Sequence, residues 1–120
     1  MALFTAGLLV APAAHAGWTT YMTSNKAKLQ LCKVPLAGGS VRMKIRLNNT
    51  NGTSKQQAGL SRIDANFKYQ TGVVVTAKAG TFSGTKSLTM TAQQRKAGQW
   101  FSTGMNNMGG EVQISKVARC

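Results

Sequence analysis

The sequence predicts an all-β protein, a small antiparallel β-sandwich or barrel with one disulfide. Apolar and polar residues alternate along several short segments, which is typical of strands with one buried face. Turn-forming runs of Gly, Asn and Ser separate these segments at fairly regular spacing, and no long window has helical periodicity. The chain of 120 residues is long enough for one domain.

Residues 41–47 give the clearest strand, because their alternation has no fault. The apolar positions are Val41, Met43, Ile45 and Leu47, and the polar positions are Arg42, Lys44 and Arg46. The Asn-Gly step at residues 51–52 predicts a turn directly afterwards.

About five further strands are expected at residues 26–34, 63–69, 73–76, 88–92 and 112–120. Phe67 and Tyr69 are expected in the core, and the last strand is expected to bulge near residues 115–116. Residues 93–99 have room for a helical turn or two, and residues 105–110 for a flexible loop or loose hairpin. Trp100 and Phe101 are neighbours on an expected strand, so one should be buried and the other exposed.

The N-terminal residues 1–16 resemble a cleaved signal peptide. The apolar run at residues 3–11 is too short to span a bilayer, and Ala14-His15-Ala16 has the small-x-small pattern of a signal peptidase site. No basic residue precedes the run, so a buried N-terminal helix or strand is the alternative. Residues 17–25 are then expected to form a flexible arm or an edge strand, and residues 26–120 the sandwich. No transmembrane segment is expected, and the protein should be secreted.

Cys32 and Cys120 are the two cysteines of the chain. In a secreted protein this count predicts one internal disulfide, which would fix the C-terminus to an early strand. Two free thiols, or a bridge between molecules through Cys120, are the alternatives.

The charge of the chain is strongly one-sided. Lys and Arg number 15 against 2 for Asp and Glu, so the formal net charge is +13. This excess predicts attraction to polyanions. The candidate binding residues are the basic row Arg42, Lys44 and Arg46 and the aromatic side chains Trp18, Tyr21 and Trp100. Alternate residues on a strand lie about 6.8 Å apart. A merely solvated strand face, and core packing of Trp100, are the alternatives.

Groups for acid–base catalysis are scarce. Cleavage after residue 16 would remove His15, the sole histidine, and leave Asp64 and Glu111 as the only acids. Each acid is expected in a salt link with one of the many cations. We therefore expect no enzyme activity, no metal and no cofactor. A glycosidase-like carboxylate pair and a nuclease that uses Arg and Lys are the enzymatic alternatives.

Three features together resemble small secreted β-sandwich proteins of actinobacteria, which include the small adaptor subunit of umbrella toxin particles. These features are the strand at residues 41–47 with its Asn-rich turn, the Gly98-Gln99-Trp100 step, and the ending at residues 115–120. The resemblance implies a bridging role without chemistry in a hetero-oligomeric secreted complex, between a lectin-like subunit and a repeat-containing toxin. It transfers no functional residue.

The expected function is that of a secreted, basic, non-enzymatic interaction module that binds an acidic protein partner or an anionic envelope polymer. Nucleic acid is a less favoured partner. A secreted cationic antibacterial or toxin-like protein and a histidine-independent nuclease are the alternative functions.

Overall fold

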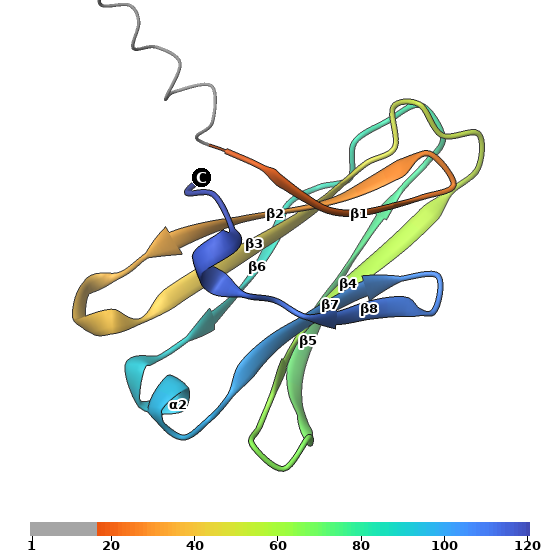
Figure 1. The fold of residues 1–120 in the computed structure, drawn as a ribbon. Helices are drawn as coiled ribbons and strands as arrows, with labels where there is room; N and C mark the ends of the chain where they lie inside the picture. The colour runs from red at the N-terminus through yellow and green to blue at the C-terminus, as the bar shows by residue number, and fades with distance from the viewer. Residues whose placement is uncertain (1–16) are drawn as a thin grey trace, which may run out of the picture.

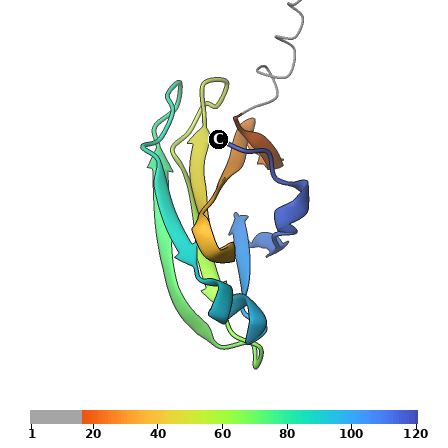
Figure 2. The ribbon, with the colours of Figure 1, turned by 90° about the vertical axis from the view of Figure 1, so that its left-hand side faces the viewer.

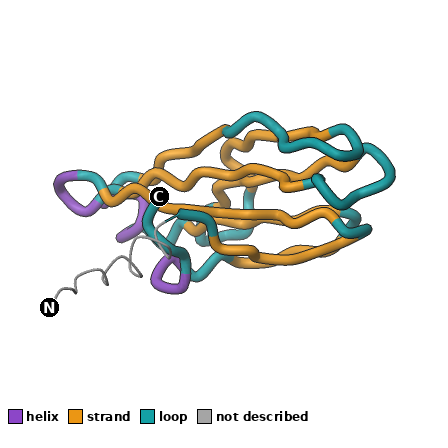
Figure 3. The backbone as a smooth tube through the Cα atoms, turned by 90° about the horizontal axis from the view of Figure 1, so that it is seen from above, coloured by secondary structure: helices purple, strands orange, loops and turns teal. Residues whose placement is uncertain are grey.

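The computed structural model describes residues 17–120, so the expected signal peptide at residues 1–16 lies outside the described residues. In the described part, eight strands form two four-stranded antiparallel sheets that pack face to face (Figure 1). The first sheet has the order β1-β2-β3-β6 and the second the order β5-β4-β7-β8. The sheets are seen side-on in Figure 1, whereas in Figures 2 and 3 the strands of the two sheets overlap, with one sheet lying over the other. The predicted all-β sandwich is confirmed.

The strands are β1 (Thr19–Ser24), β2 (Ala27–Pro35), β3 (Val41–Asn48), β4 (Gln56–Ile63), β5 (Tyr69–Ala77), β6 (Lys86–Met90), β7 (Trp100–Met105) and β8 (Met108–Glu111). The short helices are η1 (Ala37–Gly39), α2 (Ala92–Lys96) and η2 (Ile114–Lys116).

The first sheet follows the expected alternation closely. All four apolar residues of β3 are buried, and they lie beside apolar residues of the neighbouring strands, such as Leu31 of β2 and Met90 of β6. β1 lies at the edge of this sheet and pairs with β2 through a bulge between Thr20 and Met22. The segment at residues 17–25 therefore contributes an edge strand.

The predicted strand at residues 63–69 is wrong, because only its two ends lie in strands, Ile63 in β4 and Tyr69 in β5, and residues 64–68 form the turn between them. The Asp64 carboxylate accepts hydrogen bonds from the backbone amides of Asn66 (2.8 Å) and Lys68 (2.9 Å), which closes the turn. Phe67 has φ 65° and is 81% exposed, and Tyr69 is 63% exposed, so neither belongs to the core. A turn of alternating polar and apolar residues gives the same pattern as a strand.

β4 takes the place of the missing strand and was not predicted. Its inner positions are Gln56, Ala58 and Leu60, and its outer positions include Gly59 and Ser61. Gly is depleted in strands and Ser is common in turns, so the composition of this segment indicated a turn.

The C-terminal prediction is also wrong in its boundaries. The last strand is β8, which forms a hairpin with β7 through Asn106 and Asn107, both at positive φ (51° and 62°). Beyond it the chain forms η2 and a tail that makes one parallel bridge, between Arg119 and Lys33. Residue 92 likewise leaves its predicted strand, because Thr91 caps α2 in a capping box with Gln94.

The core lies between the two sheets. Phe101 is fully buried while its neighbour Trp100 is half-buried, as the alternation along β7 requires. The largest fully buried side chains are Phe101, Leu29, Leu31, Met43, Ile45, Leu47, Leu60 and Met90. Because both sheets direct their apolar side chains inward, the outer face of each sheet carries the residues available for contact.

Candidate functional site

The outer face of the first sheet carries a group of basic side chains. β3 contributes Arg42, Lys44 and Arg46 at alternate positions, and β2 contributes Lys28. Lys28 and Arg42 are exposed, whereas Lys44 and Arg46 are half-buried. We call these four residues the cationic face. The register aligns Lys28 with Asn48, Gln30 with Arg46, Cys32 with Lys44 and Val34 with Arg42.

The cationic face has no acidic neighbour within its own sheet. The chain has two acidic residues, Asp64 and Glu111, and both belong to the second sheet or its turns. Like charges about 6.8 Å apart along β3 repel one another, and no Asp or Glu side chain of this sheet offsets the repulsion. An anion bound to this face would relieve it.

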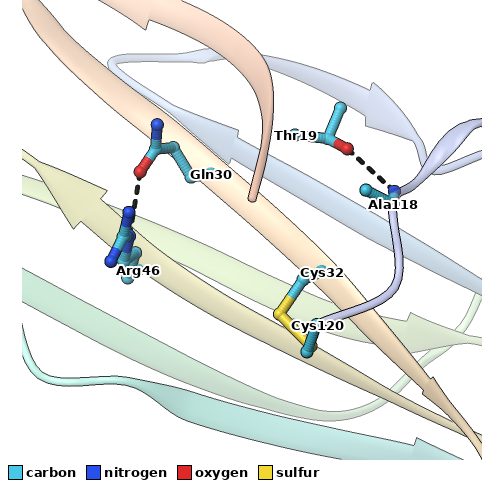
Figure 4. Close-up of a disulfide and its surroundings, with 6 residues drawn as sticks. All are labelled: Thr19, Gln30, Cys32, Arg46, Ala118 and Cys120. Atoms are coloured by element: carbon cyan, nitrogen blue, oxygen red, sulfur yellow. Dashed lines mark hydrogen bonds between the residues drawn. A yellow bond between two sulfur atoms is a disulfide. The ribbon is translucent and has the colours of Figure 1, made fainter. Parts of the chain in front are cut away.

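Arg46 is the most constrained of the four cations. Its guanidinium carbon lies 4.4 Å from the ring centre of Trp18 and 4.7 Å from that of Phe82. Its Nε donates a hydrogen bond to Oε1 of Gln30 at 2.9 Å (Figure 4), and Gln30 in turn donates to the Thr20 hydroxyl at 3.2 Å. Burial lowers the pKa of Arg46 from its ordinary value. The guanidinium is thus held in one place by two cation–π contacts and one hydrogen bond.

The aromatic side chains beside Arg46 are held by different parts of the chain. Phe82 lies in the loop between β5 and β6 and forms an isolated bridge with Asn48 at the end of β3. Trp18 directly precedes β1, and the residues on either side of it bind the C-terminal tail. Gly17 donates its backbone N–H to the carbonyl of Arg119, and Thr19 accepts a hydrogen bond from the amide of Ala118.

The C-terminal tail is fixed to β2 by hydrogen bonds and by the disulfide. Lys33 donates its amide to the carbonyl of Ala118 at 2.9 Å and accepts from the amide of Cys120 at 3.0 Å. Cys120 is bonded to Cys32, with a Cα–Cα distance of 4.9 Å and a sequence separation of 88 (Figure 4). The predicted disulfide is confirmed, and it anchors the tail that holds the segment around Trp18.

The structure brings four of the six candidate binding residues together and separates the other two. Trp18 joins Arg42, Lys44 and Arg46 on one face. Tyr21 is the extra residue of the β1 bulge, and its hydroxyl donates a hydrogen bond to the carbonyl of Glu111 at 3.3 Å. It therefore lies where β1 faces the end of β8.

Trp100 lies on the second sheet, where it is the first residue of β7 and pairs with Ile63, the last residue of β4. Its ring makes an edge-to-face contact with Phe67, at 5.8 Å between ring centres. This aromatic pair is remote from the cationic face, because the two outer faces point in opposite directions.

Sequence reasoning missed Lys28, Gln30 and Phe82 as members of the site. Lys28 and Gln30 lie on the polar side of the predicted strand at residues 26–34 and would follow from its register with β3. Phe82 is a lone aromatic in a loop of Gly, Ser and Thr, and that isolation was the available signal.

The two carboxylates come from separate parts of the second sheet. Glu111 is aligned with Ser102 and Ser102 with Ser61, which places Glu111 two strands away from β4. Asp64 follows the end of β4, so its Cα is about 14 Å from that of Glu111, from strand spacing and rise per residue. The Asp64 carboxylate is turned into its own hairpin, where it binds amide groups. The expected salt link of Asp64 is replaced by these hydrogen bonds.

Within residues 17–120, no three His, Cys, Asp or Glu side chains gather closely enough to hold a metal ion. None of the helices in this range has the length and apolar character needed to cross a membrane. No family model, no curated protein and no solved structure matches the chain.

Proposed function

We propose that this protein is a secreted, non-enzymatic interaction module whose cationic face binds an acidic protein partner or an anionic envelope polymer. The observation that carries the proposal is a four-cation face on a sheet that contains no acidic residue. The net charge of +13 attracts polyanions over a long range, and the cationic face is the surface at which a polyanion would bind.

The disulfide supports the extracellular part of this proposal. Disulfides persist in oxidising compartments and are rare in the cytosol. Together with the signal-like residues 1–16, the bond between Cys32 and Cys120 favours export. Sequencing of the N-terminus of protein recovered from the culture medium tests this directly. The expected first residue is Gly17, and a first residue within 1–16 would contradict the expected cleavage.

A more specific role follows from the resemblance to secreted actinobacterial β-sandwich proteins, namely that of an adaptor subunit in a secreted toxin complex. A basic face without catalytic groups fits a bridging role. Purification of the protein from its native medium, with mass spectrometric identification of the bound chains, tests this role. Recovery of a stoichiometric larger subunit is expected, and recovery of the protein alone at its native concentration would contradict it.

The binding face itself is tested with a triple variant, Arg42→Ser, Lys44→Ser and Arg46→Ser. We expect its affinity for polyglutamate to fall at least about tenfold, because three contacts in the central row are lost. The matched control replaces Lys68, Lys78 and Lys96, all exposed and outside the first sheet, by Ser. Both variants lose the same net charge, so equal affinities for polyglutamate would show that only total charge matters. That result would overturn the proposed site.

A further inference from the structure

The row of cations on β3 has the repeat of an extended peptide. Arg42, Lys44 and Arg46 are alternate residues of one strand, so their Cα atoms lie about 6.8 Å apart. A peptide in extended conformation presents its own alternate side chains on one face with the same spacing. Acidic residues at every second position would therefore meet this row one by one.

Arg46 differs from the other two cations because its guanidinium is already fixed. Trp18 and Phe82 stack against it, and Gln30 accepts from its Nε. The two terminal nitrogens carry the remaining N–H groups, which form the fork that binds a carboxylate through two parallel hydrogen bonds. A side chain that is ordered before binding loses less entropy when the carboxylate arrives.

Arg42, by contrast, is exposed, and its register partners are Val34 on β2 and Thr89 on β6. It supplies charge at the other end of the row without a comparable aromatic platform among its register partners. The two arginines of one strand thus form a natural comparison, with the same chemistry in a fixed and in an exposed setting.

We infer that the cationic face binds an extended acidic segment of a partner protein, with carboxylates at alternate positions, and that Arg46 anchors one carboxylate in bidentate geometry. This inference rests on the proposed function and adds the pattern of the ligand and the anchoring residue. An oligonucleotide or a polyphosphate would use the same charges without requiring the two-residue repeat.

The ligand pattern is tested with two synthetic peptides of equal length, composition and charge. One alternates Glu and Ser, and the other repeats Glu-Glu-Ser-Ser, which in an extended chain leaves acids on one face only about every 13.6 Å. We expect the alternating peptide to bind about tenfold more tightly, by calorimetry at fixed ionic strength. Equal affinities would overturn the inference, as would tighter binding of an oligonucleotide with the same charge.

The anchor is tested with Arg46→Lys and its matched control, Arg42→Lys. Both variants keep the net charge, but lysine lacks the planar fork and stacks poorly on rings. Arg46→Lys should weaken binding of the alternating peptide about tenfold, and Arg42→Lys less than about twofold. Fluorescence of Trp18, measured in a Trp100→Phe background, should change on binding. Equal effects of the two lysine variants would overturn the anchoring role.

These outcomes separate the inference from the proposed function. If both peptides bind equally and the triple serine variant loses both, the face binds anions and only the pattern is wrong. If the unmodified protein binds neither peptide nor polyglutamate, the proposed function fails as well. Thermal unfolding of each variant shows whether any loss of binding reflects loss of the fold.

Discussion

The backbone amide of Ala118 donates a hydrogen bond of 2.8 Å to the hydroxyl of Thr19, joining the start of the sandwich to its C-terminal tail (Figure 4). β1 begins at Thr19, aligned with Leu31 of β2, and the tail pairs with β2 directly beyond this point, at Lys33. The tail therefore continues the edge of the sheet where β1 stops. Because Trp18 directly precedes Thr19, the contact between the Trp18 ring and the Arg46 guanidinium depends on this junction.

Loss of the disulfide should therefore affect both stability and the cationic face. Replacing Cys32 and Cys120 together by Ser should lower the free energy of unfolding by about 2–4 kcal/mol, since a long loop is no longer closed in the unfolded chain. The tail should also detach more readily, freeing the segment at residues 17–19. Chemical denaturation measures the first effect, and fluorescence of Trp18 in a Trp100→Phe background measures the second.

Thr19→Val provides a control for the junction itself. It removes one hydrogen bond while the disulfide stays intact, and should cost about 1 kcal/mol. A double cysteine variant as stable as the unmodified protein would contradict the proposed role of the bridge. An unchanged Trp18 signal would show that the tail is not what holds this residue.

Asn49 directly follows β3 and organises the loops at this end of the strand. It is fully buried, and its side-chain amide donates hydrogen bonds to the carbonyls of Ser54 (2.9 Å) and Ala77 (3.1 Å). Asn49→Ala leaves both carbonyls without this donor, so the free energy of unfolding should fall by about 2–4 kcal/mol. Chemical denaturation tests this, and a loss below about 0.5 kcal/mol, as for an ordinary surface site, would contradict it.

Gly52 and Asn49 should be coupled. A Cβ at Gly52 would lie 1.8 Å from Oδ1 of Asn49, so Gly52→Ala forces the amide to move. The substitution should destabilise the protein in the native background and cost much less when combined with Asn49→Ala. A double-mutant cycle measures this coupling, and additive costs would show that the two residues are independent.

Two phenylalanines should respond very differently to substitution. Phe101→Ala creates a cavity in the core and should cost about 3–5 kcal/mol. Phe67→Asn should change stability by less than about 1 kcal/mol, because Phe67 is 81% exposed and Asn tolerates its positive φ. Thermal or chemical unfolding of the two variants decides between this arrangement and a core that includes Phe67, which would predict similar losses.

The contrast between these residues shows what alternation in the sequence can predict. β3 was predicted correctly because four buried apolar residues alternate with polar ones along an uninterrupted strand. The same pattern at residues 63–69 runs across the turn at residues 64–68, where Asp64 binds backbone amides and Phe67 takes a left-handed conformation. β4 was hidden because Gly59 and Ser61 occupy its outer positions. Alternation thus reports burial only when the backbone is extended.

The basic row of the site was predictable from the sequence, but the two aromatic rings that contact Arg46 were not. Arg42, Lys44 and Arg46 share a face because they alternate on one strand. Trp18 and Phe82 are distant in sequence and reach Arg46 only through the C-terminal junction and the loop between β5 and β6. Such a contact depends on tertiary structure, which no local pattern encodes.

Binding of an acidic ligand should weaken steeply with salt. Exposed charges are screened over about 8 Å at 0.15 M ionic strength and about 3 Å at 1 M, so raising the salt removes most of the attraction to Lys28 and Arg42. The contact with half-buried Arg46 should be screened less, because the rings beside it exclude part of the solvent. Affinity measured from 0.05 to 1 M NaCl should therefore fall and then level off at a residual value.

Arg46→Lys should lower this residual affinity, whereas Arg42→Lys should not. A fall to zero binding in all three proteins would show that the interaction is unspecific charge attraction.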